Sequence, residues 1–272
     1  MKKNKVIAIS MFGFVICLFL ALGFYDRLEL TQYDVYCERL PEAFNGYKIL
    51  QISDFHCQSI GDNEDELIKT IKESAPDIIV LTGDMIDGEH SIDNMIHLLK
   101  GIREIAPIYA VSGNHEEDDA ELRQQLREAY SSYGVHDVDD STVVLNSGQD
   151  QIAISGLTWD KYTLAQKDIS DYDVKYPEKF NVLLYHYANS LDQISQTKYD
   201  IAFSGHLHGG IVRLPFVGGI LGYQDMFPKY DAGVFYENNT YMVVSRGIGE
   251  AKIPRFFNRS ELVEVTLYTK LQ

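Results

Sequence analysis

Short apolar runs alternate with amphipathic segments between residues 47 and 133, and this alternation constrains the fold more than any other feature of the chain. The apolar runs have the length of buried strands, and the segments between them repeat their apolar residues with the period of a helix. Such a β-α-β-α-β-α series predicts an α/β domain. The predicted elements are strands at Tyr47–Ser53, Ile78–Thr82 and Ile108–Ser112 and helices at Glu64–Ser74, Ile92–Ile105 and Ala120–Tyr133.

From residue 142 onward the predicted elements are mostly strands, with a hairpin turn at Asn146–Asp150. A core of two sheets with outer helices accommodates both halves of the chain. Two long loops, Leu157–Glu178 and Arg213–Asp231, interrupt this pattern, and loops of such length in a compact domain are usually functional or mobile. The predicted strands are Thr142–Leu145, Ile152–Gly156, Phe180–Tyr185, Ile201–Ser204, Tyr241–Ser245 and Leu262–Tyr268.

The segment Val6–Tyr25 contains no charged residue. At 1.5 Å per residue it is long enough to cross the ~30 Å hydrocarbon core of a bilayer. Three lysines precede it and Asp26 follows it, so the positive-inside rule places the N-terminus in the cytoplasm and the rest of the chain outside. We expect a single-pass anchor in the cell membrane. A signal peptide cleaved near Ala21-Leu22-Gly23 is the alternative.

The chain therefore divides into three parts. These are a cytoplasmic tip with the anchor over residues 1–25, a juxtamembrane segment over 26–45 and one large domain over 46–272. Cys37 and Cys57 both fall on the oxidising side of the membrane, where they either pair or remain buried free thiols.

Acidic residues outnumber basic residues by 40 to 24, which gives a net charge of −16 with histidine neutral. Affinity for nucleic acid depends largely on cationic side chains that displace counterions from the phosphate backbone. A surface this acidic repels that backbone, so a polybasic nucleic-acid binder is excluded.

Polar side chains follow the predicted strands at their carboxyl ends. Since these ends converge at one edge of a sheet, the side chains are expected to face one crevice. Five of the eight histidines belong to this set, although turns and helix caps do not require histidine. The other three, His90, His97 and His136, are interpreted as ordinary helix or loop residues. The set is Asp54, His56, Asp84, Asp87, Asn114, His115, His186, His206 and His208.

Oxygen and nitrogen ligands without a thiolate suit Mn, Fe, Zn or Ni. Seven such side chains are too many for one catalytic ion with an open position, but enough for two ions ~3.5 to 4 Å apart that share a carboxylate. Asp84 is the expected bridge. Such a pair of ions lowers the pKa of a bound water and holds both oxygens of an in-line displacement at phosphorus. The expected ligands are Asp54, His56, Asp84, Asn114, His186, His206 and His208.

Five short motifs stand in a fixed order along the chain. They are Asp54-x-His56, Gly83-Asp84-x-x-Asp87-Gly88, Gly113-Asn114-His115-Glu116, His186 and Gly205-His206-x-His208. In this order they resemble the motif blocks of the calcineurin-like metallophosphoesterases. The resemblance implies a four-layer α/β/β/α sandwich for residues 46–272 and a dinuclear centre of divalent ions (Mn, Fe or Zn). It assigns one ion to Asp54, His56, Asp84 and His208, and the other to Asp84, Asn114, His186 and His206.

The resemblance also implies roles in catalysis. His115 would protonate the leaving oxygen or stabilise the transition state, Asp87 would orient the His115 ring, and a hydroxide between the two ions would attack phosphorus. Protein Ser/Thr phosphatases of this superfamily carry Arg directly after the second Asp of the second motif. Here Gly88 follows Asp87, which disfavours a phosphoprotein substrate.

The segments Gly205–Phe216, Ser245–Gly249 and Pro254–Glu261 are similar to a bacterial membrane-associated branch of the superfamily. That branch includes UDP-diacylglucosamine pyrophosphatases and cell-wall-associated phosphoesterases. The resemblance implies a phosphodiester or pyrophosphate substrate in an envelope lipid or nucleotide-sugar precursor. A broad extracellular phosphomonoesterase is a second hypothesis, and a membrane-tethered binding module without turnover is a third.

Two features outside the motifs bear on the substrate. Arg213 and Arg246 are candidates to bind a second phosphate, because a guanidinium binds oxyanions through two parallel hydrogen bonds, but ion pairs with the abundant acids are an equal alternative. The apolar stretch Leu214–Phe227 either contacts an acyl chain or the bilayer, or folds back onto the core.

Overall fold

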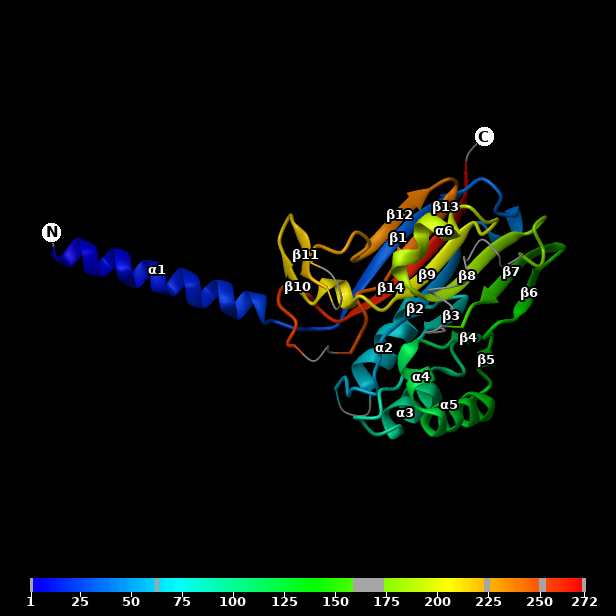
Figure 1. Cartoon of the computed structure of the whole chain (residues 1–272), viewed down its shortest axis with the longest axis horizontal. Coiled ribbons are helices and arrows are strands. Elements are labelled where there is room, and N and C mark those ends of the chain that lie inside the picture. Colours follow the sequence, from blue (N-terminus) through cyan, green and yellow to red (C-terminus); the bar gives the residue numbers. More distant parts are fainter. Residues whose placement is uncertain (1, 62–63, 159–173, 223–225, 250–252, 271–272) are drawn as a thin grey trace.

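The structure, a computed structural model, describes residues 2–61, 64–158, 174–222, 226–249 and 253–270. Two six-stranded sheets pack face to face, and helices cover their outer faces (Figure 1). The apolar side chains between the sheets come from both of them, for example Ile49 and Val80 from one and Val182 and Phe203 from the other. The predicted α/β fold with four layers is confirmed.

The first sheet has the strand order β1–β14–β2–β3–β4–β5. Strands β2 to β5 are parallel, as the alternation of strands and helices predicts. They are β2 (Tyr47–Ile52), β3 (Ile78–Thr82), β4 (Ile108–Val111) and β5 (His136–Asp137). The helices on the outer face pack through buried residues such as Leu67, Leu98 and Leu126. They are α2 (Asp65–Ser74), α3 (Asp93–Ile102) and α5 (Ala120–Tyr133).

The second sheet has the order β12–β13–β9–β8–β7–β6, in which β7, β8, β9 and β13 are parallel. Its outer face is covered by the short helix α6 (Leu191–Ile194) and the 3-10 turn η4 (Ala188–Ser190). Its strands are β6 (Thr142–Ser147), β7 (Asp150–Gly156), β8 (Phe180–Tyr187), β9 (Ile201–Gly205), β12 (Gly233–Glu237) and β13 (Thr240–Val244).

The two sheets are aligned so that their parallel strands end at the same edge. The side chain of Gln51 in β2 donates a hydrogen bond of 2.8 Å to the carbonyl of Ser204 in β9. The ring of His186 in β8 bonds to the carbonyl of Thr82 in β3 at 2.7 Å. Short elements also lie at this edge, among them α4 (Asn114–Asp118) and the 3-10 turn η5 (His208–Gly210).

One expected boundary differs from the structure. Part of the expected juxtamembrane segment forms a strand, β1 (Glu29–Cys37), which pairs in parallel along its whole length with β14 (Glu261–Thr269). Gln32 donates a hydrogen bond of 2.7 Å to Glu264 across this pair. The folded domain therefore begins before residue 46. An edge strand with alternating half-exposed residues has a weak local pattern, and its partner lies at the other end of the chain.

One of the two expected long loops contains a hairpin, and most of the other lies outside the described residues. Within Arg213–Asp231 the structure has a hairpin of β10 (Val212–Leu214) and β11 (Gly218–Leu221). Most of Leu157–Glu178, including Trp159, lies outside the residues that the structure describes.

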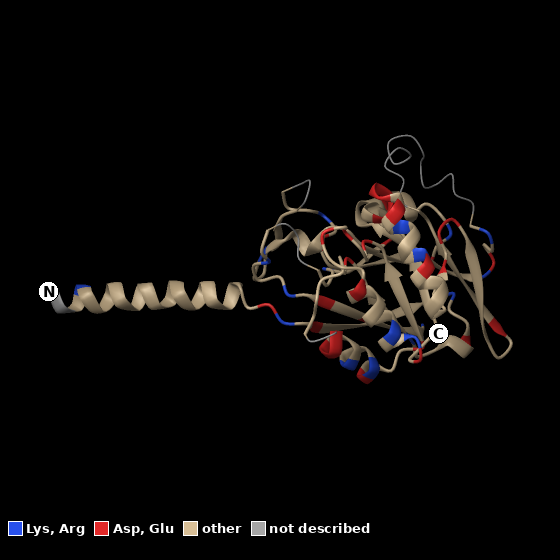
Figure 2. Cartoon of the chain, turned by 90° about the horizontal axis from the view of Figure 1, so that it is seen from below, with Lys and Arg blue, Asp and Glu red and all other residues tan. Residues whose placement is uncertain are grey.

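The N-terminal helix α1 (Lys2–Gly23) projects from the domain (Figures 1 and 2). Its stretch Asn4–Gly23 is long and apolar enough to cross a membrane, and only 6% of it is buried.

Cys37 and Cys57 are buried free thiols and do not form a disulfide with each other. Burial raises the pKa of each thiol to about 12.

Candidate metal centre

Six of the seven predicted metal ligands, together with His115, gather in three overlapping groups at the shared edge of the sheets. Within each group the ligand atoms lie within 4.8 Å of one another. Asp84 and His56 each belong to two of the groups, so the groups form one cluster. The three groups are Asp54 with His56 and His208, His56 with Asp84 and His115, and Asp84 with His186 and His206.

The closest approaches within the cluster join ring nitrogens to each other and to carboxylates. Nε2 of His56 lies 3.3 Å from Nε2 of His208. The latter atom is 3.5 Å from Oδ1 of Asp54. On the other side, Nε2 of His186 is 3.1 Å from Oδ2 of Asp84 and 3.9 Å from Oδ1 of Asp54. Both carboxylates therefore lie between histidines from different strands.

A buried polar atom tests whether a metal fits this cluster. Within the described residues, Oδ1 of Asn114 has no hydrogen-bond partner. Most buried polar atoms in folded proteins have one, so each exception needs a cause. A mixed set of carboxylate, amide and imidazole ligands around such an atom fits a divalent transition-metal site.

The backbone of the cluster is strained. Five of the seven predicted ligands have a positive φ, between 45° and 73°, namely Asp54, His56, Asp84, His206 and His208. Residues other than glycine rarely adopt this region, which costs about 1 to 3 kcal/mol each, and such residues concentrate at functional sites. This backbone conformation directs side chains from successive loops towards the same point.

Two glycines of the motifs allow the loops to approach each other. A Cβ on Gly113 would overlap Oδ1 of Asp84, and a Cβ on Gly205 would overlap the side chains of Ser53 and Asp54. No larger residue fits at either position without moving a predicted ligand, which explains the glycines before Asn114 and His206.

Buried Glu116 fixes the loop that carries Asp84. Its carboxylate accepts hydrogen bonds from the backbone N–H groups of Asp84 (2.9 Å), Met85 (2.6 Å) and Gly113 (2.7 Å). Glu116 belongs to the motif Gly113-Asn114-His115-Glu116, but no role was expected for it. Its position three residues after Gly113, at the start of a helix, is the sequence feature that could have indicated a capping role.

Hydrogen bonds orient two of the predicted ligands. Because the carbonyl of Thr82 bonds to Nδ1 of His186 at 2.7 Å, Nε2 of that ring is directed at the cluster. The backbone N–H of His206 donates to Oδ1 of Asp54 at 3.0 Å.

The histidines of the cluster fall into two electrostatic classes. Burial lowers the pKa of His56 to about 4 and that of His206 to about 3, so both rings are neutral at pH 7, the form that binds metals. Burial also opposes charge on His186, but the Asp84 carboxylate outweighs it and raises the pKa of His186 to about 10.

His115 lies in the cluster, whereas Asp87 is oriented differently from expectation. The His115 ring packs edge-to-face on His56 with 4.8 Å between centroids, and the backbone N–H of His115 donates to Oδ1 of Asp84 at 2.9 Å. Asp87 bonds to the ring of His90 at 2.8 Å. No hydrogen bond joins Asp87 to His115 in the described part of the chain, so the orienting role expected for Asp87 is not seen there. His90, interpreted as an ordinary residue, is the partner because Asp87 also accepts its backbone N–H.

The two arginines expected to bind substrate are both in ion pairs. Arg213 contacts Asp231 at 2.9 Å and the carbonyl of Gly209 at 2.6 Å. Arg246 contacts Glu29 and Glu261, each at 2.8 Å. The structure thus shows the ion pairs that the sequence analysis gave as the alternative.

A third arginine, which the sequence analysis did not single out, is buried behind Asp54. The Arg255 guanidinium donates to the carbonyls of Arg246 (2.9 Å), Gly247 (3.2 Å) and Gly249. The backbone N–H of Gly249 in turn donates to the carbonyl of Asp54 at 2.7 Å. Arg255 therefore supports the loop against which Asp54 packs.

The comparison with protein families agrees with this geometry. The family described as calcineurin-like phosphoesterase matches residues 47–210, which include every residue of the cluster. The chain belongs to this family. It is accordingly a metal-dependent phosphoester hydrolase, and the resemblance stated from the five motifs is confirmed.

Three relatives align over most of their length. The chain is 30% identical to the uncharacterized metallophosphoesterase YkuE of Bacillus subtilis, over 88% of this chain and 85% of the relative. It is 25% identical to phosphodiesterase YaeI of Escherichia coli, over 81% and 82%. It is 24% identical to the UDP-2,3-diacylglucosamine pyrophosphatase LpxG of Chlamydia muridarum, over 87% and 88%.

Proposed function

We propose that this phosphoesterase is anchored in the cell membrane, faces away from the cytoplasm and uses two divalent metal ions to hydrolyse a phosphodiester or pyrophosphate bond. The observation that carries the proposal is the convergence of two carboxylates and five imidazoles at one sheet edge, with ligand atoms within 4.8 Å of one another in each group. A shared carboxylate and more ligands than one ion needs favour two ions.

Each ion has its own set of residues in this proposal. One ion (Mn, Fe or Zn) is held by Asp54, His56, Asp84 and His208, and the other by Asp84, Asn114, His186 and His206. Divalent cations at these positions supply Lewis acidity towards phosphoryl oxygens and make water more acidic. The unpartnered Oδ1 of Asn114 supports its place in the second set.

His115 is the proposed proton donor to the leaving oxygen. Its ring lies against His56 and within the same group as Asp84, so it reaches the reaction centre without being needed as a ligand. A positioned imidazole gives a proton or a positive charge near neutral pH, and either stabilises the developing alkoxide. Loss of such a group typically lowers the rate by about 10² to 10⁴.

The substrate class rests on the relatives and on the motif around Gly88. One relative is named a phosphodiesterase and another a pyrophosphatase of a diacylated nucleotide sugar. Together with Gly88 in place of arginine, these names favour a diester or pyrophosphate, in a lipid or nucleotide-sugar precursor, over a phosphoprotein.

The location rests on α1. Its apolar stretch Asn4–Gly23 has the length of a membrane span. Lys2 and Lys3 before this stretch, Lys5 at its start and Asp26 after it favour an extracytoplasmic domain.

The decisive experiment combines metal analysis with a substrate panel. The full chain, purified in detergent without oxygen, is analysed for bound metal and assayed on a matched monoester, diester and pyrophosphate, beside Asp84→Asn and His115→Ala. Two metals per chain and preference for the diester or pyrophosphate support the proposal. Faster monoester hydrolysis would favour the phosphomonoesterase, and metal-loaded protein without turnover would favour the binding module.

A further inference from the structure

The end of α1 is packed against the domain. The ring of Phe19 contacts those of Phe256 and Phe257, with centroids 5.7 and 5.0 Å away, and Phe24 also contacts Phe256 at 4.9 Å. The N–H of Phe257 donates to the carbonyl of Gly23 at 2.6 Å. The segment 256–257 is therefore held beside the last turns of the helix.

The position of Phe19 gives the depth of this contact. It lies inside the apolar stretch Asn4–Gly23, four residues before its end. At 1.5 Å per residue this is about 6 Å below the end of the helix. If the stretch spans a bilayer, the two rings that touch Phe19 must enter the membrane surface, and the domain cannot stand clear of it.

The same segment is fixed to the β10–β11 hairpin and to a loop of the metal cluster. Val212 of β10 forms a bridge with Phe256, and the N–H of Arg213 donates to the carbonyl of Phe256 at 2.9 Å. The side chain of Asn258 donates to the carbonyl of His208 at 2.7 Å. Helix end, hairpin and predicted ligand thus form one continuous hydrogen-bonded unit.

This end of the domain exposes large apolar side chains. They are Phe216 and Val217 at the tip of the hairpin, Met226 and Phe227 beside β11, and Ile253 in the segment that leads to Phe256, exposed to between 46% and 109%. We call these five residues the anchor-side surface. Among the nearby arginines, Arg259 is exposed, whereas Arg255 is buried and Arg213 is paired with Asp231. Exposed apolar side chains beside the end of a membrane-spanning helix suit contact with the headgroup layer of a bilayer.

We propose that the anchor-side surface inserts into the headgroup layer of the membrane that α1 spans, and so holds the metal cluster at the membrane surface. The partner is a lipid bilayer. The inference rests on the proposed function in one respect, that α1 is a membrane span. It predicts that the phosphorus attacked lies close to the membrane surface.

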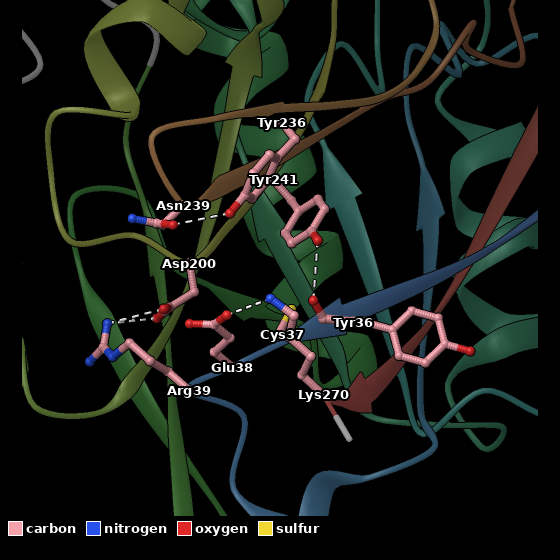
Figure 3. A pocket seen from close by; sticks show the side chains of 9 residues that line it. All are labelled: Tyr36, Cys37, Glu38, Arg39, Asp200, Tyr236, Asn239, Tyr241 and Lys270. Atoms are coloured by element: carbon pink, nitrogen blue, oxygen red, sulfur yellow. Dashed lines mark hydrogen bonds and ion pairs between the residues drawn. The ribbon is translucent and has the colours of Figure 1, made fainter. Parts of the chain in front are cut away.

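Tryptophan placed at the hairpin tip tests the depth of insertion. The full chain with Trp159→Phe is reconstituted in vesicles of phosphatidylcholine and phosphatidylglycerol, with or without bromine on the acyl chains, and carries either Phe216→Trp or Tyr236→Trp. Tyr236 is a matched control because it is an exposed aromatic residue, with 58% of its surface accessible. It lies in β12, where it pairs with Tyr241 of β13. It lines a cavity of about 200 Å³ with Lys270 (Figure 3), and no residue of the metal cluster lines this cavity.

Brominated lipid should remove most of the fluorescence of the Phe216→Trp chain and little of that of the Tyr236→Trp chain. Equal quenching of the two overturns the proposed surface. Extraction at alkaline pH tests the anchor separately, since a chain that spans the bilayer stays in the membrane. If the chain stays in the membrane and both tryptophans are quenched equally, only the proposed insertion of the anchor-side surface is rejected. If alkaline pH releases the chain, the proposed membrane anchor is rejected. Turnover of a soluble chromogenic diester shows that both variants are folded.

Discussion

The Nε2 atom of His186 and the Oδ2 atom of Asp84 lie 3.1 Å apart, although the two residues belong to different sheets. His186 is in β8, and Asp84 follows β3. Neither side chain is exposed to more than 3%, so water does not screen the pair. The contact joins the carboxyl ends of the two sheets and places the shared carboxylate of the cluster.

Asp84→Asn should abolish most metal binding and activity. The substitution removes the carboxylate that two of the ligand groups share and keeps the size of the side chain. Even the loss of a partner outside the coordination sphere typically costs about 10- to 100-fold in metal affinity or activity, so we expect at least about a 100-fold loss of kcat. Metal analysis and diester hydrolysis measure it. Asp34→Asn, at an exposed position in β1, is the control, and a normal metal content in Asp84→Asn would contradict the assignment.

Substitution of His115 should affect the rate of hydrolysis differently from substitution of Asp87 or His90. Because His115 is in the cluster and Asp87 bonds to His90, His115→Ala should lower the rate by about 10² to 10⁴ on esters with poor leaving groups and much less on good ones. The losses of rate caused by Asp87→Asn and by His90→Ala should be similar in size. Rates on a series of diesters with leaving groups of increasing pKa separate these cases. If Asp87→Asn instead matched His115→Ala across the series, Asp87 would act through His115 during turnover.

The cluster and the central strands were predictable because their evidence is local. Each apolar run of strands β2, β3, β4, β8 and β9 is followed at once by a polar motif, and parallel strands bring such motifs to one edge. The helices agree with prediction for a similar reason, since each shows its apolar face within a single segment.

The features that were missed depend on contacts between distant segments or on side-chain geometry. β1 is recognisable only by its pairing with β14, more than 200 residues away. The bond between Asp87 and His90 depends on a turn in which two backbone N–H groups converge on one carboxylate oxygen. The support that Arg255 gives to Gly247 and Gly249 likewise requires the fold, because a buried guanidinium that binds carbonyls has no sequence pattern of its own.

Cys37 and Cys57 should react only after unfolding. Burial raises the folded pKa of each thiol from its ordinary value of 9 to about 12, so almost no thiolate is present at pH 8. Because the folded pKa is the higher one, the stability that the neutral thiols contribute is present below pH 9 and is lost as the pH rises towards 12. Labelling by iodoacetamide in the Cys17→Ser chain, with and without denaturant, measures reactivity. Rapid labelling of the folded chain would contradict the burial.

Arg255→Met should destabilise the domain and weaken metal binding together. Burial lowers the pKa of Arg255 to about 10, which leaves it charged at neutral pH and bonded to the loop behind Asp54. Hydrogen bonds to a charged group are each worth roughly 1.5 to 3 kcal/mol, so losing them should lower the free energy of unfolding by about 3 kcal/mol. Arg259→Met, at an exposed position, is the matched control. Thermal unfolding with and without chelator reports both effects, and an unchanged Tm would show that the loop needs no such support.

Replacing the apolar tip of the hairpin should separate membrane-bound from soluble substrates. Phe216 and Val217 are exposed, so the double variant Phe216→Ser, Val217→Ser should leave the core and the metal cluster intact. Burying an apolar side chain contributes roughly 1.5 to 3 kcal/mol, so removing two should lower the rate on a vesicle-embedded diester by at least about tenfold. The rate on a soluble chromogenic diester should not change. Tyr236→Ser, in the edge strand β12 of the second sheet, is the control for loss of an exposed aromatic ring. Equal loss on both substrates would mean that the hairpin supports the metal cluster rather than contact with lipid.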